Sequence, residues 1–455
     1  MLPRAELVIS LVFALAVSGT ALAAEGGKDL IANGDFSAEG PGGAPADWTP
    51  RLPLCREAAV TLRRTPEGLL VESPTEPYGV GGVEQMLAGI TGSQAYAVEV
   101  DCDVRGIASP FRSVIVRLMW MRGGKMLHPC GMLARGPRVE GERATFRDVL
   151  VAPAEADAAR LSLEVKWPQG GTAVFRRASV RPTDPPPPRK VRVGTVYLRP
   201  KNSTPEKNMD LWCAKIDEAG RLGLDIVCLG EAVLQVGTGK DVNALAEPIP
   251  GPSTERLGAA AKRNRIWVVA GLTERDGRRV YNTAVLLDRE GRPAGTYRKV
   301  HLPREEWQKG IIPGGEYPVF KTDFGTIGIQ ICYDWFFPEA AEAFALKGAE
   351  ILFAPTWGNT LPDQDGRAEG ETVFRVRARD NGIYMVPSVY DGSSMVIDPM
   401  GRILASNKGA EGVFWAEIDL ARREALPWVG PWRAIGPRDR MPETYGPLTG
   451  RPEQP

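Results

Sequence analysis

The sequence predicts two folded regions, an all-β sandwich followed by an α/β domain, and its 455 residues are more than one typical domain needs. Three observations carry this prediction. Residues 95–104, 112–121 and 158–167 alternate apolar and polar side chains, as half-buried antiparallel strands do. Four consecutive prolines, 185–188, favour an extended and semi-rigid spacer. After residue 191, short buried strands alternate with helical patterns, which is typical of an α/β domain.

The first residues have the pattern of a secretory signal. Arg4 supplies the positive charge, residues 7–17 the apolar core and residues 21–23 a small-residue cleavage site. A membrane anchor is the alternative, but Ser18-Gly19-Thr20 interrupt the apolar run before it reaches the ~20 residues of a span. We therefore expect an exported protein, periplasmic or secreted, with no stable membrane span. The predicted segments are a signal peptide over 1–24, a β-sandwich over 25–181, a linker over 182–190 and an α/β domain over 191–455.

Composition excludes several classes of partner. Lysine plus arginine equals aspartate plus glutamate at 56 each, so no net charge favours nucleic acid or an anionic membrane. The six cysteines match no zinc-binding spacing, and their pairing cannot be assigned from the sequence. No phosphate-cradling glycine loop appears in a strand–helix context. We therefore expect no cofactor and no metal.

The opening of the predicted sandwich carries a short recognisable segment. Residues 30–50 read LIANGDFSAEGPGGAPADWTP. This segment resembles the first strand of jelly-roll modules of the carbohydrate-binding type, in which Phe36 and Trp48 pack against the sandwich. The resemblance implies a carbohydrate partner for this region. The alternative is a sandwich that merely packs on the second region.

The second region is built from strands and helices in alternation. One helix is expected to begin at Pro205, capped by Ser203 or Thr204, and a hairpin is expected to turn at residues 289–291. The remaining predicted strands cover residues 190–198, 224–231, 266–272, 350–355, 383–390 and 393–405. The remaining predicted helices cover residues 252–264 and 367–380.

Three chemically capable residues follow strands of this region. Glu231 follows the strand DIVCLG, Lys299 follows AGTYR, and Cys332 follows IGIQI. Each one alone has an ordinary explanation, because a charged residue that ends a strand is usually solvated and a lone cysteine usually fills a core. Strand ends of α/β folds, however, can converge on one crevice while the sheet holds them rigidly.

The sequence segments around these residues resemble those of the nitrilase-type carbon–nitrogen hydrolase superfamily. They are GEAVLQ at residues 230–235, YRKVHLPREEW at 297–307 and GIQICYDWFFPE at 328–339, and the resemblance covers about residues 191–420. It implies a four-layer αββα sandwich, two copies of which often associate through their outer helices as a homodimer. One departure is Gly230, where the family usually has proline before the base.

The resemblance implies a role for each matching position. Cys332 matches the nucleophile, Glu231 the general base and Lys299 the cationic partner. A second glutamate often assists in the family; Glu306 is the better match and Glu305 the alternative. The chain has only two histidines. His301 lies within the segment YRKVHLPREEW and is interpreted as structural.

Several aromatic and polar residues near the nucleophile are candidates for the substrate pocket. Tyr333, Trp357 and Asn359 are predicted to contact substrate, and the backbone N–H of Tyr333 to help stabilise an oxyanion. For Phe336 and Phe337 we favour core packing over a pocket role.

The predicted reaction is hydrolysis of a small linear amide or N-carbamoyl compound through a cysteine thioester, with release of ammonia. Nitrile hydrolysis by the same residues is an alternative, and so is a glycan- or cell-surface-binding protein whose hydrolase domain is dispensable. Arg304 or Arg367 could hold a substrate carboxylate.

Overall fold

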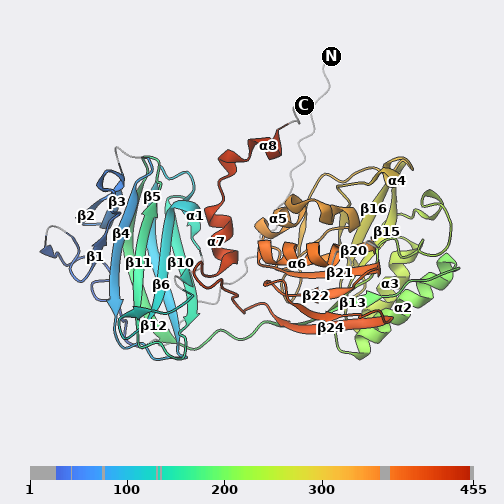
Figure 1. Ribbon diagram of the computed structural model, residues 1–455, viewed down its shortest axis with the longest axis horizontal. Helices are drawn as coiled ribbons and strands as arrows, with labels where there is room; N and C mark the ends of the chain where they lie inside the picture. Colours follow the sequence, from blue (N-terminus) through green and yellow to red (C-terminus); the bar gives the residue numbers. More distant parts are fainter. Residues whose placement is uncertain are drawn as a thin grey trace, which may run out of the picture.

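The computed structural model describes residues 27–41, 44–73, 77–129, 132–133, 136–358 and 369–450. Two regions lie side by side, a β-sandwich and an α/β region, with a C-terminal helix between them (Figure 1). The predicted signal peptide, residues 1–24, lies outside the described residues. Among the described helices, none combines the length and apolar character needed to cross a bilayer.

The first region consists of two antiparallel six-stranded sheets. One sheet has the order β1 (Thr49–Arg51), β4 (Val80–Leu87), β11 (Ala158–Lys166), β6 (Val114–Arg122) and β7 (Lys125–Met126), with β8 (Met132–Leu133) also paired to β6. The other has the order β2 (Thr61–Thr65), β3 (Gly68–Glu72), β12 (Thr172–Thr183), β5 (Ala95–Arg105), β10 (Arg143–Val151) and β9 (Arg138–Glu140). A single one-turn helix, α1 (Pro110–Ser113), precedes β6.

The alternating side chains of these strands fill one core between the sheets. Phe36 and Trp48 belong to that core, with ring centroids 5.2 Å apart, so the opening segment packs inward as the sequence predicted. The strand β12 continues to Thr183, two residues into the predicted linker, because its last residues still pair with β5.

The second region contains two further six-stranded sheets, each mixed in direction. One has the order β17 (Pro293–Arg298), β16 (Arg279–Leu287), β15 (Trp267–Asp276), β14 (Ile226–Cys228), β13 (Lys190–Tyr197) and β24 (Gly412–Asp419). The other has the order β18 (Val319–Lys321), β19 (Thr326–Ile329), β20 (Ile351–Gly358), β21 (Tyr384–Asp391), β22 (Met395–Ile397) and β23 (Ile403–Ser406). Their facing side chains share one hydrophobic cluster.

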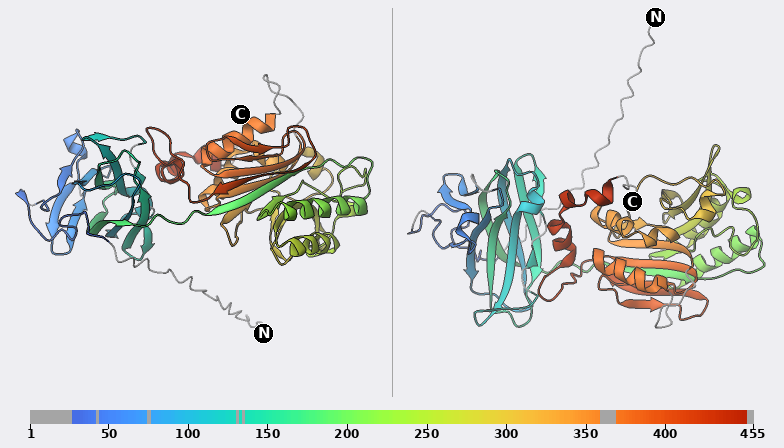
Figure 2. Two further views of the ribbon diagram at one scale, coloured as in Figure 1. Left: turned by 90° about the horizontal axis from the view of Figure 1, so that it is seen from below. Right: turned by 45° about the horizontal axis from the view of Figure 1, so that its top comes forward.

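Two helix pairs cover the outer faces of these sheets, so the layers run helix, sheet, sheet, helix (Figure 2). The first pair is α2 (Pro205–Arg221) and α3 (Pro252–Asn264), and the second is α5 (Pro338–Leu346) and α6 (Glu369–Asn381). The helix α2 begins where predicted, because Thr204 accepts a hydrogen bond from the Lys207 N–H at 3.3 Å and Pro205 occupies the first turn. The α/β class of this region is confirmed.

The last described residues leave the α/β region, which the sequence did not predict. The helix α7 (Trp432–Asp439) lies between the sandwich and the end of α6 (Figure 1). Ile435 packs on Ile115 of β6, while the Trp432 indole donates to the Asp380 carbonyl at 2.6 Å. The short helix α8 (Gly446–Thr449) follows. The C-terminal segment therefore contacts both regions.

Candidate active site

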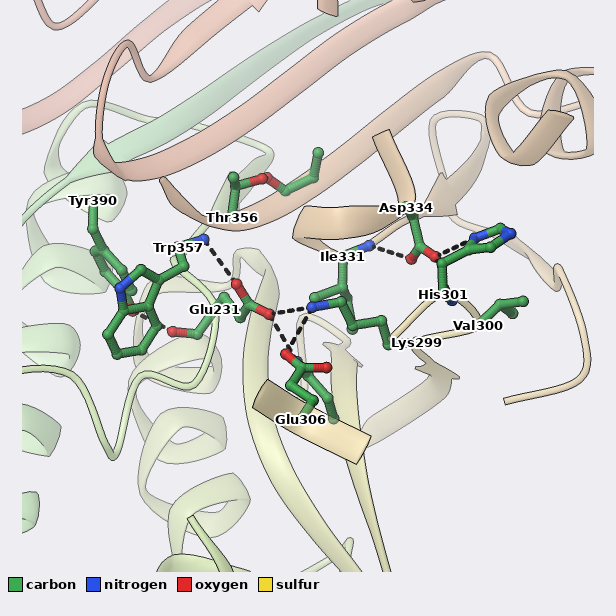
Figure 3. Close-up of polar contacts among 12 residues, drawn as sticks. Glu231, Lys299, Val300, His301, Glu306, Ile331, Asp334, Thr356, Trp357 and Tyr390 are labelled. Carbon is green, nitrogen blue, oxygen red and sulfur yellow. Dashed lines mark hydrogen bonds and ion pairs between the residues drawn. The ribbon is translucent and has the colours of Figure 1, made fainter. Parts of the chain in front are cut away.

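Three strand ends bring the predicted catalytic residues to one place. Glu231 follows β14, Lys299 follows β17 and Cys332 follows β19, where it opens a 3-10 helix, η4 (Cys332–Phe336). Glu306 comes from the one-turn helix α4 (Arg304–Trp307). The side chains of Glu231, Lys299 and Glu306 point toward one another (Figure 3). The two facing sheets thus supply the side chains of one cluster.

A compact polar cluster forms around the ammonium of Lys299. Its Nζ lies 3.0 Å from Glu231 Oε1 and 2.8 Å from Glu306 Oε1. Asn282 of β16 donates from Nδ2 to the same two oxygens, at 2.7 and 2.9 Å. The remaining oxygen of Glu306, Oε2, is buried and has no hydrogen-bond partner among the described residues. The Lys299 ammonium thus pairs with two carboxylates, and Glu306 Oε2 is left without a hydrogen-bond donor.

Backbone groups and a tyrosine hold Glu231. Its Oε2 accepts the Trp357 N–H at 2.8 Å, and its carbonyl accepts the Tyr390 hydroxyl at 2.6 Å (Figure 3). Tyr390 also explains the glycine that replaces the family's proline. A Cβ at position 230 would lie 2.4 Å from the Tyr390 ring, closer than nonbonded carbon atoms approach, so the ring fills the space a side chain would need.

The thiol of Cys332 sits beside this cluster in a strained backbone position. Its φ of +42° lies in the left-handed region, which costs a residue with a side chain about 1–3 kcal/mol and recurs at functional sites. Burial, and after it the negative charge of Glu231, raises the pKa of Cys332 to about 12, although the Lys299 charge acts in the opposite direction. The resting side chain of Cys332 is therefore a neutral thiol, which becomes nucleophilic when a base removes its proton.

Burial acts on the charged partners too. For Lys299, burial alone would lower the pKa, but attraction to Glu231, to the Cys332 thiolate form and to Glu306 together raise its pKa. The pKa of Glu306 is raised, first by burial and then by repulsion from Glu231, against the attraction of Lys299. The lysine thus stays an ammonium at neutral pH.

A second buried network supports the turn that carries the nucleophile. Asp334, which is fully buried, accepts the Ile331 N–H at 2.9 Å and the Tyr297 hydroxyl at 2.7 Å through Oδ2. Its Oδ1 accepts the His301 N–H at 3.0 Å and lies 2.9 Å from His301 Nδ1 (Figure 3). His301 follows Lys299 by two residues, so Asp334 ties the cysteine turn to the lysine loop. The structure places His301 in a supporting position.

The predicted pocket residues fall into different surroundings. Trp357 is the next-to-last residue of β20 and is 42% exposed, at the edge of the site. The Tyr333 ring packs on Phe336 and Phe337, at centroid distances of 5.0 and 5.5 Å. The core prediction is wrong for Phe336, which is 48% exposed although the Trp335 ring stacks on it at a centroid distance of 3.8 Å. Asn359 lies outside the described residues, as does Arg367.

Three residues of the site were not predicted. Asn282 is an amide in the mostly apolar strand VYNTAVLL, and a buried amide in such a strand indicates a hydrogen-bonding role. Asp334 lies two residues after Cys332, within the segment GIQICYDWFFPE, so its position near Cys332 could have indicated a role in the site. Tyr390 ends a strand far along the chain and gave no local signal.

Residues 192–427 match the family model described as carbon-nitrogen hydrolase, which is more than half of the chain. The chain belongs to the carbon-nitrogen hydrolase family. It is therefore an enzyme of the amidase and nitrilase type, and the family resemblance drawn from the sequence is confirmed for this region. Among the described residues, no group of three or more His, Cys, Asp or Glu side chains is placed to hold a metal ion.

Named relatives align with about half of this chain. The omega-amidase NIT2 of Xenopus tropicalis is 32% identical over 233 residues, 47% of this chain and 83% of the relative. A nitrilase of Pyrococcus abyssi is 33% identical over 247 residues, 50% of this chain and 90% of the relative. The crystal structure of Saccharomyces cerevisiae Nit3 aligns with a TM-score of 0.45 at 26% identity, covering 50% of this chain and 90% of that one.

Proposed function

We propose that this carbon-nitrogen hydrolase cleaves a small linear amide or N-carbamoyl compound through a thioester on Cys332 and releases ammonia. The observation that carries the proposal is the cluster in which Lys299 Nζ lies within 3.0 Å of Glu231 and 2.8 Å of Glu306, beside the thiol. The omega-amidase relatives, about a third identical over most of their length, support an amide substrate.

The first half of the reaction forms the thioester. Because the pKa of Cys332 is raised to about 12, Glu231 removes the thiol proton as sulfur attacks the carbonyl carbon. The Lys299 ammonium and the Tyr333 backbone N–H stabilise the negative carbonyl oxygen; loss of one such donor typically slows a reaction about 10²- to 10³-fold. Glu231 then returns the proton to the leaving nitrogen, the C–N bond breaks, and ammonia departs.

The second half restores the enzyme. Water loses a proton to Glu231 and attacks the thioester carbonyl, and the carboxylic acid leaves as the thiol is re-formed. The two backbone and side-chain contacts to Glu231, from Trp357 and Asn282, keep its carboxylate aimed at the thiol through both halves. Glu306 Oε2, the buried oxygen without a donor, is positioned to accept an N–H of the substrate.

The test uses substitutions of two cysteines. Cys332→Ala should abolish ammonia release from short aliphatic amides while the melting temperature changes little, whereas Cys213→Ala, on the partly exposed surface of α2, should retain full activity. Mass spectrometry of the wild-type enzyme quenched during turnover should find the acyl adduct on Cys332. Ammonia release by the Cys332→Ala protein would refute the mechanism.

Nitrile hydrolysis is the second candidate, supported by the Pyrococcus abyssi nitrilase. Parallel assays with amides, N-carbamoyl compounds and nitriles of the same carbon skeleton separate the two, since ammonia release from nitriles alone would favour it. Arg304, exposed on α4, is the described candidate for a substrate carboxylate, and carboxylate-bearing substrates test it through Arg304→Gln.

For the N-terminal region we propose a jelly-roll module that binds carbohydrate. Strand order supports it, because β3, β5, β10 and β12 lie in one sheet while β4, β6 and β11 lie in the other, so the chain crosses repeatedly between sheets. Cys332→Ala protein should still be retained on insoluble polysaccharide or cell-wall preparations. Retention without any hydrolase activity of the wild type would favour the binding-protein alternative.

We also propose that the protein is exported and that it forms a homodimer through its outer helices. The signal-like residues 1–24 support export, which fractionation of expressing cells would test. Leu346 of α5 and Val376 of α6 support the dimer, since these apolar side chains are 44% and 41% exposed. Sedimentation of the wild type should give a dimer, and Val376→Glu should shift it toward the monomer.

A further inference from the structure

A cavity of about 320 Å³ lies where the sandwich, the α/β region and the C-terminal segment meet. Phe111 and Gly136 line it from the sandwich, α6 contributes Arg379, and α7 contributes Trp432 and Arg438. None of the catalytic side chains lines it. In Figure 1 this junction is where α7 lies between the two larger regions. The volume falls in the range of small-molecule sites, about 300–1,000 Å³.

The charged residues of this junction cavity are mostly cationic. Six arginines and two glutamates line it. Three of the arginines are paired with carboxylates: Arg189 with Glu350 at 2.8 and 3.0 Å, Arg422 with Glu424 at 3.0 Å, and Arg423 with Asp148. Arg379 is exposed and has no carboxylate partner among the described residues. The surplus of guanidinium groups gives the cavity a positive field.

The most buried of these cations, Arg438, has no carboxylate within ion-pair distance in the part of the chain that the structure describes. Arg438 is 3% exposed and donates to three backbone carbonyls, those of Phe111, of Val114 at 2.9 Å and of Gly136 at 3.2 Å. Its Nε has no acceptor among the described residues. Burial lowers the pKa of Arg438 to about 10, since carbonyl dipoles do not replace a full negative charge. An anion in the cavity would supply that charge.

The rest of the lining is apolar. Met400, Leu420, Leu426 and the ring of Trp432 face the same space as the arginines. A site that combines guanidinium groups with hydrocarbon and aromatic walls suits a molecule with an anionic head and an apolar body. We infer that the junction cavity binds a small organic anion of this kind, a carboxylate or a phosphate monoester, between the two regions of the protein.

Calorimetry with the full-length wild-type protein tests this inference. The probes are octanoate, 4-phenylbutyrate and phenyl phosphate, with 4-phenylbutanol as the uncharged match for the aromatic carboxylate. We expect at least one anion to bind with one site per chain, and the alcohol to bind at least tenfold more weakly. Binding of the carboxylates alone, or of phenyl phosphate alone, identifies the head group.

Three variants locate the site. Arg379→Gln should weaken binding on the order of fivefold, and Met400→Trp, which fills the space while keeping every charge, should abolish it. Arg278→Gln, an exposed arginine of the β15–β16 turn outside the cavity, should bind as the wild type does. Failure of all three anions to bind at millimolar concentration would overturn the inference. So would binding that survives Met400→Trp, since the probe would then occupy another site, such as the active site.

Discussion

The outer face of the sandwich and the active site both bury carboxylates, but they pair them differently. On the sandwich, Asp101 is 9% exposed and lies 2.8 Å from Arg147, and Asp103, 8% exposed, accepts Arg176 at 2.7 Å. Each of these two acids has a close arginine whose own side chain reaches solvent. In the site, Glu231 and Glu306 share Lys299, whose side chain is fully buried.

This difference separates a stabilising surface from a reactive one. An exposed arginine can pair with an acid at little cost, and such pairs contribute about 0–1 kcal/mol. Burying a lysine between two carboxylates removes three charged groups from water, and each removal costs free energy. The cluster also leaves Glu306 Oε2 without a hydrogen-bond donor. The site therefore keeps a buried acceptor that a substrate can use, whereas neither aspartate of the sandwich has a buried oxygen without a partner among the described residues.

The largest expected effect comes from removing the shared cation. Lys299→Met leaves two buried carboxylates facing each other, so we expect the free energy of unfolding to fall by about 3–5 kcal/mol. We also expect kcat/KM to fall by at least about 10³, because the oxyanion loses its charged partner. Denaturant unfolding and an ammonia assay measure the two losses.

Arg147→Met is the matched change on the sandwich. It removes a half-exposed cation from Asp101 and, at 3.8 Å, from Glu99, so we expect a stability loss of ~1 kcal/mol and full activity. Equal stability losses in the two variants would show that burial does not distinguish the two clusters.

The next effect concerns Asp334, which positions the nucleophile turn. Asp334→Asn replaces an oxygen that accepts from two donors by an NH₂ group, so one pair of its contacts, to Ile331 and Tyr297 or to His301, must break. We expect a loss of about 2–4 kcal/mol in stability and a fall in kcat with little change in KM. Asp103→Asn, which affects an acid held by arginine on the sandwich, should leave both kinetic constants unchanged. A rise in KM alone for Asp334→Asn would contradict a positioning role.

The order of elements could be predicted because it depends on local pattern. The cap at Thr204, the proline-led helix α3 and the hairpin at residues 289–291 each follow from a few neighbouring side chains. The path of residues 421–450 could not be predicted. The helix α7 is short and weakly patterned, and it is placed by distant contacts such as Trp432 to Asp380 and Ile435 to Ile115.

The same division holds in the site. The sequence predicted three of the site residues, Glu231, Lys299 and Cys332, because each lies in a short segment that resembles the family and the three segments follow one another in the family's order. Asn282 and Tyr390 were not predicted, since their roles depend on which strands become neighbours: Tyr390, 159 residues after Glu231, reaches its carbonyl only through the stacking of two sheets. The family pattern gave no reason for Gly230, whereas the Tyr390 ring beside it does.

A smaller effect tests that tyrosine. Tyr390→Phe removes the hydroxyl that donates to the Glu231 carbonyl at 2.6 Å, and we expect about 1 kcal/mol lower stability and a roughly threefold lower kcat. Tyr96→Phe is the match on the sandwich, since Tyr96 is equally buried and its hydroxyl accepts the Thr91 N–H at 2.7 Å. It should lose similar stability and no activity. An unchanged kcat in Tyr390→Phe would mean that this bond does not help to place the base.

The smallest perturbation is a change of pH. Its effect on the reactivity of the thiol can be compared between Cys332 and Cys102. Burial is the main cause of a raised pKa in both Cys332, at about 12, and Cys102 of the sandwich core, but only Cys332 is partly accessible and next to a base. Thiolate forms as pH rises toward the pKa, so modification of free Cys332 by methyl methanethiolsulfonate should accelerate about tenfold per pH unit from pH 7 to 10, without a plateau.

Peptide mapping after a timed reaction assigns the label to each cysteine, and Cys102 should stay unmodified until the protein unfolds. A plateau near pH 8, or fast labelling of Cys332 at pH 7, would show that Lys299 holds a thiolate in the resting enzyme. Glu231 would then have no proton to remove in the first step. The slope of this pH profile therefore decides between a thiol activated by its neighbouring carboxylate and a thiolate stored beside an ammonium.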